Sequence, residues 1–306
     1  MRNEECPPSS VDCELIANDY INKDIFRLVF VWQNDPQTEF ITRTRLAAPK
    51  AGQFFMIKPQ RSAVFLGRPI SVAKWELALK DREYIRRKVR SKGTAYQRYL
   101  TGKYLESDVV TFLIALRGRG TEELAVMRTG ERAELIGPLG NAWTDFLPPA
   151  KKGNNERIAL VGGGMGMAPL NALLCESPGY HFHVYAGFKT GFRSMEAKRA
   201  LLGPAYEAEK LVLATENGKE GLKGRVPDFL KPDDYAAVCA CGPEPMLKAV
   251  AEKCKASATP CFVSLERRMA CGVGACLGCT VRTVNGNRRC CADGPIFKAD
   301  EVVFSE

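Results

Sequence analysis

The chain has 306 residues, of which 45% are hydrophobic, so its length and composition predict a globular protein of two or three domains. No stretch approaches the roughly 20 apolar residues of a membrane span, and the polar N-terminus lacks the pattern of a secretory signal. The net charge of +9 comes without a nucleic-acid motif, so nucleic-acid binding is not expected. Twelve cysteines without a signal favour metal ligation in a reducing cytoplasm over a disulfide scaffold.

The first part of the chain predicts short strands. Residues 13–18, 25–32 and 54–59 combine apolar and polar residues in strand patterns, and the turn at 49–53 precedes the third strand. Short strands separated by Gly and Pro turns are typical of an antiparallel barrel or sandwich. The run Arg68-Pro69-Ile70-Ser71 follows. An arginine fork can grip a pyrophosphate and a small serine admits a planar ring, so this run is a candidate flavin contact or a plain strand start with an exposed arginine.

A basic segment occupies about 75–107, with nine Lys or Arg and two acids between Lys80 and Lys103. It fits a solvated surface hairpin, a docking face for an acidic partner, or, less well, a nucleic-acid contact. A strand at 109–116 comes next, and glycines then lead into a short helix at 122–127. Free N–H groups at such a helix start can bind an anion. A strand at 133–136 ends in the turn Gly137-Pro138-Leu139-Gly140-Asn141.

The linker-like residues 148–155 mark a boundary, after which the continuously apolar strand 157–161 runs into a glycine loop and a helix reaching Cys175. Strand, glycine loop and helix are the layout of a dinucleotide site, although Pro169 stands where G-x-G-x-x-G needs its third glycine. The loop residues of interest are Gly162, Gly163, Gly164 and Gly166.

Further strands at 181–186, 211–214 and 236–241, with helical stretches at 196–202 and 227–230, predict a Rossmann-like sheet. Cys241-Gly242-Pro243 follows the last strand, at the edge where ligands bind. His181 and His183 are the only histidines, and we interpret both as structural, so histidine-based catalysis is not expected. The sequence offers no other candidate general base, and no catalytic residue is predicted.

Cysteines near the C-terminus have the spacing of a plant-type [2Fe–2S] site. Cys271, Cys276 and Cys279 give C-x4-C-x2-C, and Cys290 and Cys291 offer a fourth ligand. Adjacent side chains in an extended chain point apart, so only one of these two should reach the metal. Structural zinc usually shows two separated C-x2-C pairs, and only one is present; zinc and unligated thiols or disulfides are the alternatives.

Small and basic residues surround these cysteines. Gly272, Gly274 and Gly278 allow tight bends that bring N–H groups to the sulfurs. Four arginines could offset the negative charge of a thiolate-bound cluster: Arg267, Arg268, Arg282 and Arg289.

Taken together, these motifs resemble the ferredoxin-reductase-like flavoproteins. They occur in the order typical of that superfamily: Gly52-Gln53, Arg68–Ser71, Gly120-Thr121, Gly137–Asn141, Gly162–Pro169 and Cys241–Met246. The run Ser264-Leu265-Glu266-Arg267-Arg268-Met269-Ala270-Cys271, with Asp293-Gly294-Pro295, resembles most the family of electron-transfer subunits of class 1B, NAD-dependent dihydroorotate dehydrogenase. The resemblance covers nearly all of residues 13–300.

The resemblance implies an α+β multidomain protein: an FAD-binding antiparallel β-barrel at 1–150, an NAD-binding α/β domain at 151–253 and a small [2Fe–2S] domain at 254–306. It implies FAD contacts at Arg68, Pro69, Ile70 and Ser71, at Leu113, Ile114 and Ala115, and at Gly120 and Thr121. The implied cluster ligands are Cys271, Cys276, Cys279 and Cys291, with Cys290 a bystander. The family's second flavin run usually ends in arginine, where this chain has Ala115, and Arg117 is a possible substitute.

The function that the resemblance implies is electron transfer between NAD(H) and a separate FMN-containing dihydroorotate dehydrogenase subunit, in a heterotetramer serving pyrimidine biosynthesis in the cytoplasm. An NAD(P)H reductase of a ferredoxin-type acceptor is the rival enzyme, and Lys189 and Arg193 leave NADP open. A colourless zinc protein that docks nucleic acid through the basic segment is the rival of another class.

Overall fold

The computed structural model describes residues 9–32, 48–76, 108–147, 156–177 and 179–304. The chain forms two compact units, one of residues 1–49 and 54–138 and the other of residues 50–53 and 139–306. Nearly all of the predicted basic segment, from residue 77 to 107, lies outside the described residues. In the described ranges, no helix is both long and apolar enough to span a membrane.

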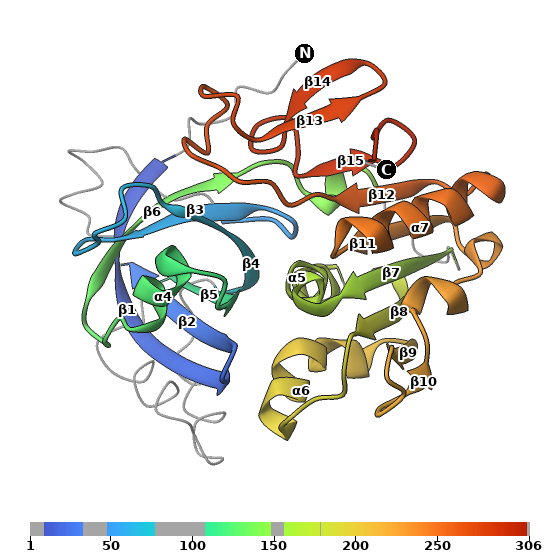
Figure 1. Cartoon of the computed structure of the whole chain (residues 1–306), viewed down its shortest axis with the longest axis horizontal. Coiled ribbons are helices and arrows are strands. Elements are labelled where there is room, and N and C mark those ends of the chain that lie inside the picture. The colour runs from blue at the N-terminus through green and yellow to red at the C-terminus, as the bar shows by residue number, and fades with distance from the viewer. Residues whose placement is uncertain (1–8, 33–47, 77–107, 148–155, 178, 305–306) are drawn as a thin grey trace. The chain divides into compact units, whose positions relative to one another are not determined.

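The first unit is a closed barrel with the strand order β1-β2-β5-β4-β3-β6, blue to green in Figure 1. Alternate residues of β2 fill its interior, where Phe26, Leu28 and Phe30 are fully buried. This confirms the predicted antiparallel barrel. The strands are β1 (Ser9–Asn22), β2 (Ile25–Trp32), β3 (Phe54–Pro59), β4 (Arg68–Glu76), β5 (Asp108–Ala115) and β6 (Arg132–Leu139), and the helix is α4 (Arg119–Ala125).

The second unit is built on a seven-stranded sheet of order β10-β9-β8-β7-β11-β12-β15, green to red in Figure 1. Its pairs are parallel except β12 with β15. The strands are β7 (Arg157–Gly163), β8 (His181–Phe188), β9 (Lys210–Thr215), β10 (Leu222–Lys223), β11 (Ala237–Cys241), β12 (Cys261–Ser264) and β15 (Ile296–Lys298). The helices are α5 (Met167–Glu176), α6 (Met195–Leu202) and α7 (Glu244–Ala256).

The strand order of this sheet reverses between β7 and β11. The chain moves from β7 to β8 and β9, then returns to β11 on the other side of β7 and continues to β12. Such a reversal is the switch point at which ligands bind outside the carboxyl ends of the strands. β7 ends in Gly163 and β11 ends in Cys241, so both predicted dinucleotide segments begin at this point.

The predicted cluster region contributes to the same sheet. β12 pairs with β11, and β15 pairs with β12, while β13 (Thr280–Thr283) and β14 (Gly286–Arg289) form a separate hairpin. The division of the chain at residues 150 and 253 therefore stays a prediction, since residues 254–306 lie in one compact unit with the nucleotide sheet.

The predicted helical stretch at 227–230 is a 3-10 turn, Val226–Phe229, with further turns of this type at Trp143–Asp145, Gly164–Gly166, Pro204–Glu207 and Pro232–Asp234. Pro227 can begin a helix but the segment is too short to continue one, because Leu230 returns to an extended conformation.

The two histidines lie on one face of β8, at the N-terminal end of the strand and away from the switch point. His183 Nδ1 is 3.0 Å from the Tyr235 hydroxyl, which is 2.7 Å from the Tyr185 hydroxyl. Glu209 approaches both rings, at 3.4 Å from His181 and 3.8 Å from His183. These hydrogen-bonded side chains lie away from the carboxyl ends of the strands, where ligands bind, which agrees with a structural role for both histidines.

Acidification below about pH 6.5, the usual pKa of histidine, should destabilise this unit through His183. Burial lowers the pKa of His183, Lys210 and Arg157 lower it further, and Glu209 opposes them. Because the folded-state pKa is depressed, stability is present above the unfolded pKa and is lost as the pH falls through the folded one. We expect the melting temperature of H183Q to fall less between pH 7 and pH 5 than that of the parent protein.

The exposed His181 supplies the control for this experiment. H181Q removes an exposed imidazole from the same strand, and its pH profile should match the parent protein. If H181Q and H183Q flatten the profile equally, burial of His183 is not the cause.

Candidate functional site

Backbone N–H groups of the cysteine loop, residues 271–279, donate hydrogen bonds to the cysteine sulfurs. Gly274 donates to Cys291 Sγ at 3.1 Å, Cys276 donates to Cys271 Sγ at 3.4 Å, and Gly278 donates to Cys276 Sγ at 3.5 Å. The loop reaches this shape through positive φ angles at Gly272, Gly274 and Leu277. Burial alone would raise the pKa of Cys271, but N–H donors of the loop outweigh it and lower that pKa to about 6. These N–H groups therefore favour the thiolate form of Cys271.

The four expected ligands form two pairs. The Cys276 N–H donates to Cys271 Sγ, and the Cys291 N–H donates to Cys279 Sγ, both at 3.4 Å. Two pairs of thiolates match the ligand set that a cluster of two irons needs.

The adjacent cysteines point in opposite directions. Cys290 is fully buried, and its thiol donates to the Leu265 carbonyl oxygen at 3.1 Å. Cys291 Sγ instead accepts the Gly274 N–H, and its own N–H donates to Cys279 Sγ at 3.4 Å. This arrangement supports Cys291 as the fourth ligand and a core role for Cys290.

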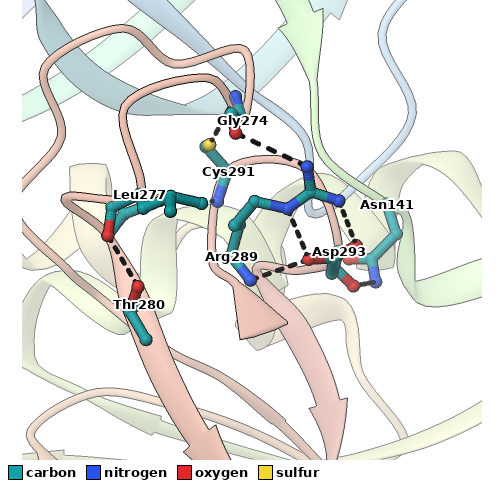
Figure 2. Close-up of polar contacts among 8 residues, drawn as sticks. Asn141, Gly274, Leu277, Thr280, Arg289, Cys291 and Asp293 are labelled. Atoms are coloured by element: carbon teal, nitrogen blue, oxygen red, sulfur yellow. Dashed lines mark hydrogen bonds and ion pairs between the residues drawn. The ribbon is translucent and has the colours of Figure 1, made fainter. Parts of the chain in front are cut away.

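An arginine clamp, Arg289 with Asp293, spans the turn that carries Cys291, as Figure 2 shows. Arg289 Nε and Nη2 donate to the two carboxylate oxygens of Asp293 at 2.9 and 3.0 Å, and the Arg289 N–H adds a bond of 2.7 Å. The third guanidinium nitrogen, Nη1, donates to the Gly274 carbonyl oxygen at 3.4 Å. Asn141 anchors the far side of the turn through the carbonyl oxygens of Asp293 and Ile296.

Two of the four arginines expected to offset cluster charge have carboxylate partners. Arg289 forks onto Asp293, and Arg267 Nη1 lies 3.1 Å from Glu244 Oε2, at the start of α7. Their positive charge is thus largely compensated in place, and their contacts are structural. The other two arginines, Arg268 and Arg282, are both exposed.

The three predicted flavin segments lie together in the barrel unit. Val72 pairs with Phe112, and this register brings Arg68–Ser71 of β4 beside Leu113–Ala115 of β5. α4 follows β5, and its Gly120 packs against the Arg68 guanidinium so closely that an added Cβ would lie 1.6 Å from Nε. These segments therefore lie side by side, although Ile114 is buried in the barrel core and is not presented at the surface. The arginine has room only because residue 120 is glycine.

Thr121 has a shaping role that its sequence position did not reveal. Its hydroxyl accepts the N–H groups of Arg117 and Gly118 and donates to the Gly118 carbonyl oxygen. It thereby closes the loop that presents Gly120. Arg117, the possible substitute for the arginine missing at Ala115, is exposed two residues beyond β5.

The two predicted dinucleotide segments touch backbone to backbone at the switch point. A Cβ on Gly166 would lie 2.1 Å from the Cys241 carbonyl oxygen, and one on Gly242 would lie 3.0 Å from Gly163 Cα. Gly164 is different, because its φ is +56° and a Cβ there would meet nothing within 4 Å. Pro243 is exposed at the start of α7. The loop is thus tight where it faces protein and open at Gly164.

Sequence reasoning missed the parts that join distant segments. Asn141 was noted only within a turn motif, yet it holds the Asp293–Ile296 turn. Arg289 and Asp293 bracket two cysteines at an i, i+4 spacing, and that pattern could have suggested the clamp. The loop after β9 also escaped notice, although Gly218, Gly221 and Gly224 all have positive φ.

Fold and site together define an electron-transfer protein with the ferredoxin-reductase-like fold. A chain of an NADH-dependent reduced ferredoxin-NADP oxidoreductase matches with a TM-score of 0.67 and 22% identity, over 95% of this chain and 90% of that one. A ferredoxin NADP⁺ reductase from Neisseria gonorrhoeae with bound FAD and NADP matches with a TM-score of 0.53 and 14% identity, over 81% and 91%. At such identities these likenesses show the fold, and they confirm the predicted architecture.

Sequence relatives identify the family. Residues 266–303 match the iron-sulfur cluster binding domain of dihydroorotate dehydrogenase B. Two proteins named "Dihydroorotate dehydrogenase B (NAD(+)), electron transfer subunit" are similar to this chain. The one from Clostridium perfringens is 34% identical over 83% of this chain and 87% of its own length. The one from Caldanaerobacter subterraneus is 31% identical over 95% of this chain and 97% of its own length. The chain belongs to this family of electron transfer subunits, which confirms the resemblance drawn from its motifs.

Proposed function

We propose that this chain carries electrons between NAD(H) and an FMN-containing catalytic subunit that oxidises dihydroorotate to orotate, in the direction of NAD⁺ reduction. The single observation that carries the proposal is the set of backbone N–H groups that donate to the four cysteine sulfurs, in a chain that belongs to the electron transfer subunit family. When bound, FAD exchanges two electrons with NAD(H), and the [2Fe–2S] cluster carries electrons singly.

The chain's own residues would hold and orient these groups. Cys271, Cys276, Cys279 and Cys291 would bind the two irons as thiolates. The N–H groups of the loop would direct hydrogen bonds to the sulfurs, the kind of contact by which proteins set the potential of such clusters.

The barrel residues would bind FAD. Arg68 presents a guanidinium that, in the described chain, donates only to the neighbouring Gly67 carbonyl oxygen, which leaves its fork for a diphosphate. Ser71, with the 113–115 run beside it, would lie along the isoalloxazine.

The switch-point loops would bind the dinucleotide. The open space above Gly164 lets a pyrophosphate approach the backbone, and Cys241–Pro243 would lie beside the nicotinamide. Lys189 and Arg193 are exposed after β8, so a 2′-phosphate is not sterically opposed there.

Gly120→Ala should weaken FAD binding without unfolding the barrel. The new Cβ would displace the Arg68 guanidinium, a flexible group, rather than backbone. The loss of one charge-assisted contact should cost about 2 kcal/mol, or roughly thirtyfold in the Kd for FAD. Equilibrium titration of the apoprotein with FAD measures this. Gly118→Ala is the matched control, since a Cβ there meets nothing within 4 Å, and it should leave the Kd unchanged.

The partner and compartment belong to the proposal as well. The relatives' name calls them electron transfer subunits, so we propose a heterotetramer of two such chains with two catalytic subunits. Cysteines of the described chain are all free, which suits a reducing cytoplasm.

The visible spectrum of anaerobically purified protein, before and after NADH, tests the proposal. Flavin and iron–sulfur bands that bleach with NADH are expected, followed by reduction of FMN when the catalytic subunit is added. A colourless protein without iron would refute the relay. Bleaching without FMN reduction, together with fast reduction of ferredoxin, would refute the dihydroorotate role and leave the ferredoxin-type reductase.

A further inference from the structure

We infer that the Arg289–Asp293 clamp is a positioning device that aims the Gly274 N–H at the fourth ligand sulfur and so sets the reduction potential of the cluster. The inference rests on the proposed function in one respect, that Cys291 binds the cluster. It goes beyond that function because it gives a role to two residues that are not ligands.

Gly274 is held from two sides. Its N–H donates to Cys291 Sγ at 3.1 Å, and its carbonyl oxygen accepts Arg289 Nη1 at 3.4 Å. Its φ of +81° is a conformation that favours glycine, and a Cβ there would lie 3.1 Å from Arg289 Nη1 and 3.0 Å from Ala292 Cβ. The guanidinium therefore fits against this glycine and limits how its peptide groups can rotate.

Asp293 holds the guanidinium in place. Both carboxylate oxygens are engaged by the planar fork, and Oδ2 also accepts the Arg289 N–H. The turn is closed again by the Asp293 N–H, which donates to the Arg289 carbonyl oxygen at 2.8 Å. A lysine could not reproduce this, because an ammonium lacks the rigid planar fork.

The clamp joins the two halves of the cluster site. Gly274 belongs to the loop of the first three cysteines, whereas Arg289 and Asp293 bracket the turn that carries Cys291 (Figure 2). N–H bonds to a cluster sulfur favour the reduced, more negative state and so raise the potential. Loosening the clamp should misdirect the Gly274 N–H and make the cluster harder to reduce.

The decisive experiment is an anaerobic redox titration of the holoprotein followed by the EPR signal of the reduced cluster. For R289K we expect a shift to lower potential equal to about tenfold in the reduction equilibrium, which is ~59 mV for a one-electron couple. R289Q should shift at least as far. R288Q removes the same charge from the adjacent exposed residue without touching the clamp, so it measures the effect of charge alone, and its shift should be smaller than that of R289Q.

Asp293→Asn separates the effect of positioning from the effect of charge, because the two effects shift the reduction potential in opposite directions. Removing a negative charge near the cluster would by Coulomb attraction raise the potential. Loss of the clamp would lower it, and we expect the lower value. A parent-like potential for R289K, or a raised one for D293N, would overturn the inference. The clamp residues would then affect the potential through their charges only.

Two other outcomes are also decisive. If R289K and R289Q lose iron while FAD content and melting temperature stay unchanged, the clamp is needed for assembly only, and the tuning role fails. If the parent protein itself shows no [2Fe–2S] signal, the proposed function fails, independently of the clamp.

Discussion

Cys291→Ser will abolish the iron–sulfur cluster, whereas Cys290→Ser will leave it intact. A serine hydroxyl is a hard oxygen donor that stays protonated near neutral pH, so it cannot replace a soft thiolate on iron. At position 291 the exchange removes a ligand that lies under the Gly274 N–H. At position 290 it replaces a buried thiol donor by a hydroxyl donor to the same Leu265 carbonyl oxygen.

Iron analysis, the EPR signal and the flavin spectrum measure this prediction together. For C291S we expect near-complete loss of iron with FAD retained, because the flavin segments belong to the barrel unit. C276S should behave in the same way. C290S should keep full iron and lose about 1 kcal/mol of stability at most. A C290S protein without iron beside a C291S protein with iron would transfer the fourth ligand to Cys290.

Local patterns allowed most elements to be predicted from the sequence. β2 and β3 were predicted with the bounds that the structure has, because strand patterns ended at clear turns. β7 was recognisable from its continuous apolar run, which is buried on both sides. The cysteine stretch was recognisable because the ligands of a cluster loop are close in sequence and their spacing is itself the constraint.

Contacts between distant segments could not be predicted in this way. The approach of Gly120 to Arg68 depends on strand register, and the bonds from Asn141 to Asp293 cross about half the chain. The choice between Cys290 and Cys291 depended on which way the turn faces, and the Arg289 clamp sets that turn. Sequence spacing carries no information on such directions until the surrounding elements are in place.

Gly166→Ala will prevent reduction of the protein by NADH. A Cβ at this position would lie 2.1 Å from the Cys241 carbonyl oxygen, 2.4 Å from its carbon and 2.8 Å from the Gly242 nitrogen. These are backbone atoms at the end of a buried strand, so no side chain can swing away to relieve the clash. β7 and β11 must separate at the switch point, which should cost about 3 kcal/mol and distort both loops that would hold the dinucleotide.

Gly164→Ala provides the comparison that separates distortion from blocked access. Its Cβ would meet no protein atom within 4 Å, so the fold should lose only the roughly 1–2 kcal/mol of an alanine at a φ of +56°. That Cβ would project into the space a pyrophosphate needs, so the Kd for NADH should still rise. Stopped-flow bleaching of the flavin by NADH, with dithionite as the loop-independent reductant, distinguishes the two variants. Both should bleach fully with dithionite, G166A should not respond to NADH, and G164A should respond only at raised NADH. Parent-like bleaching of G166A would show that these loops do not form the NADH site.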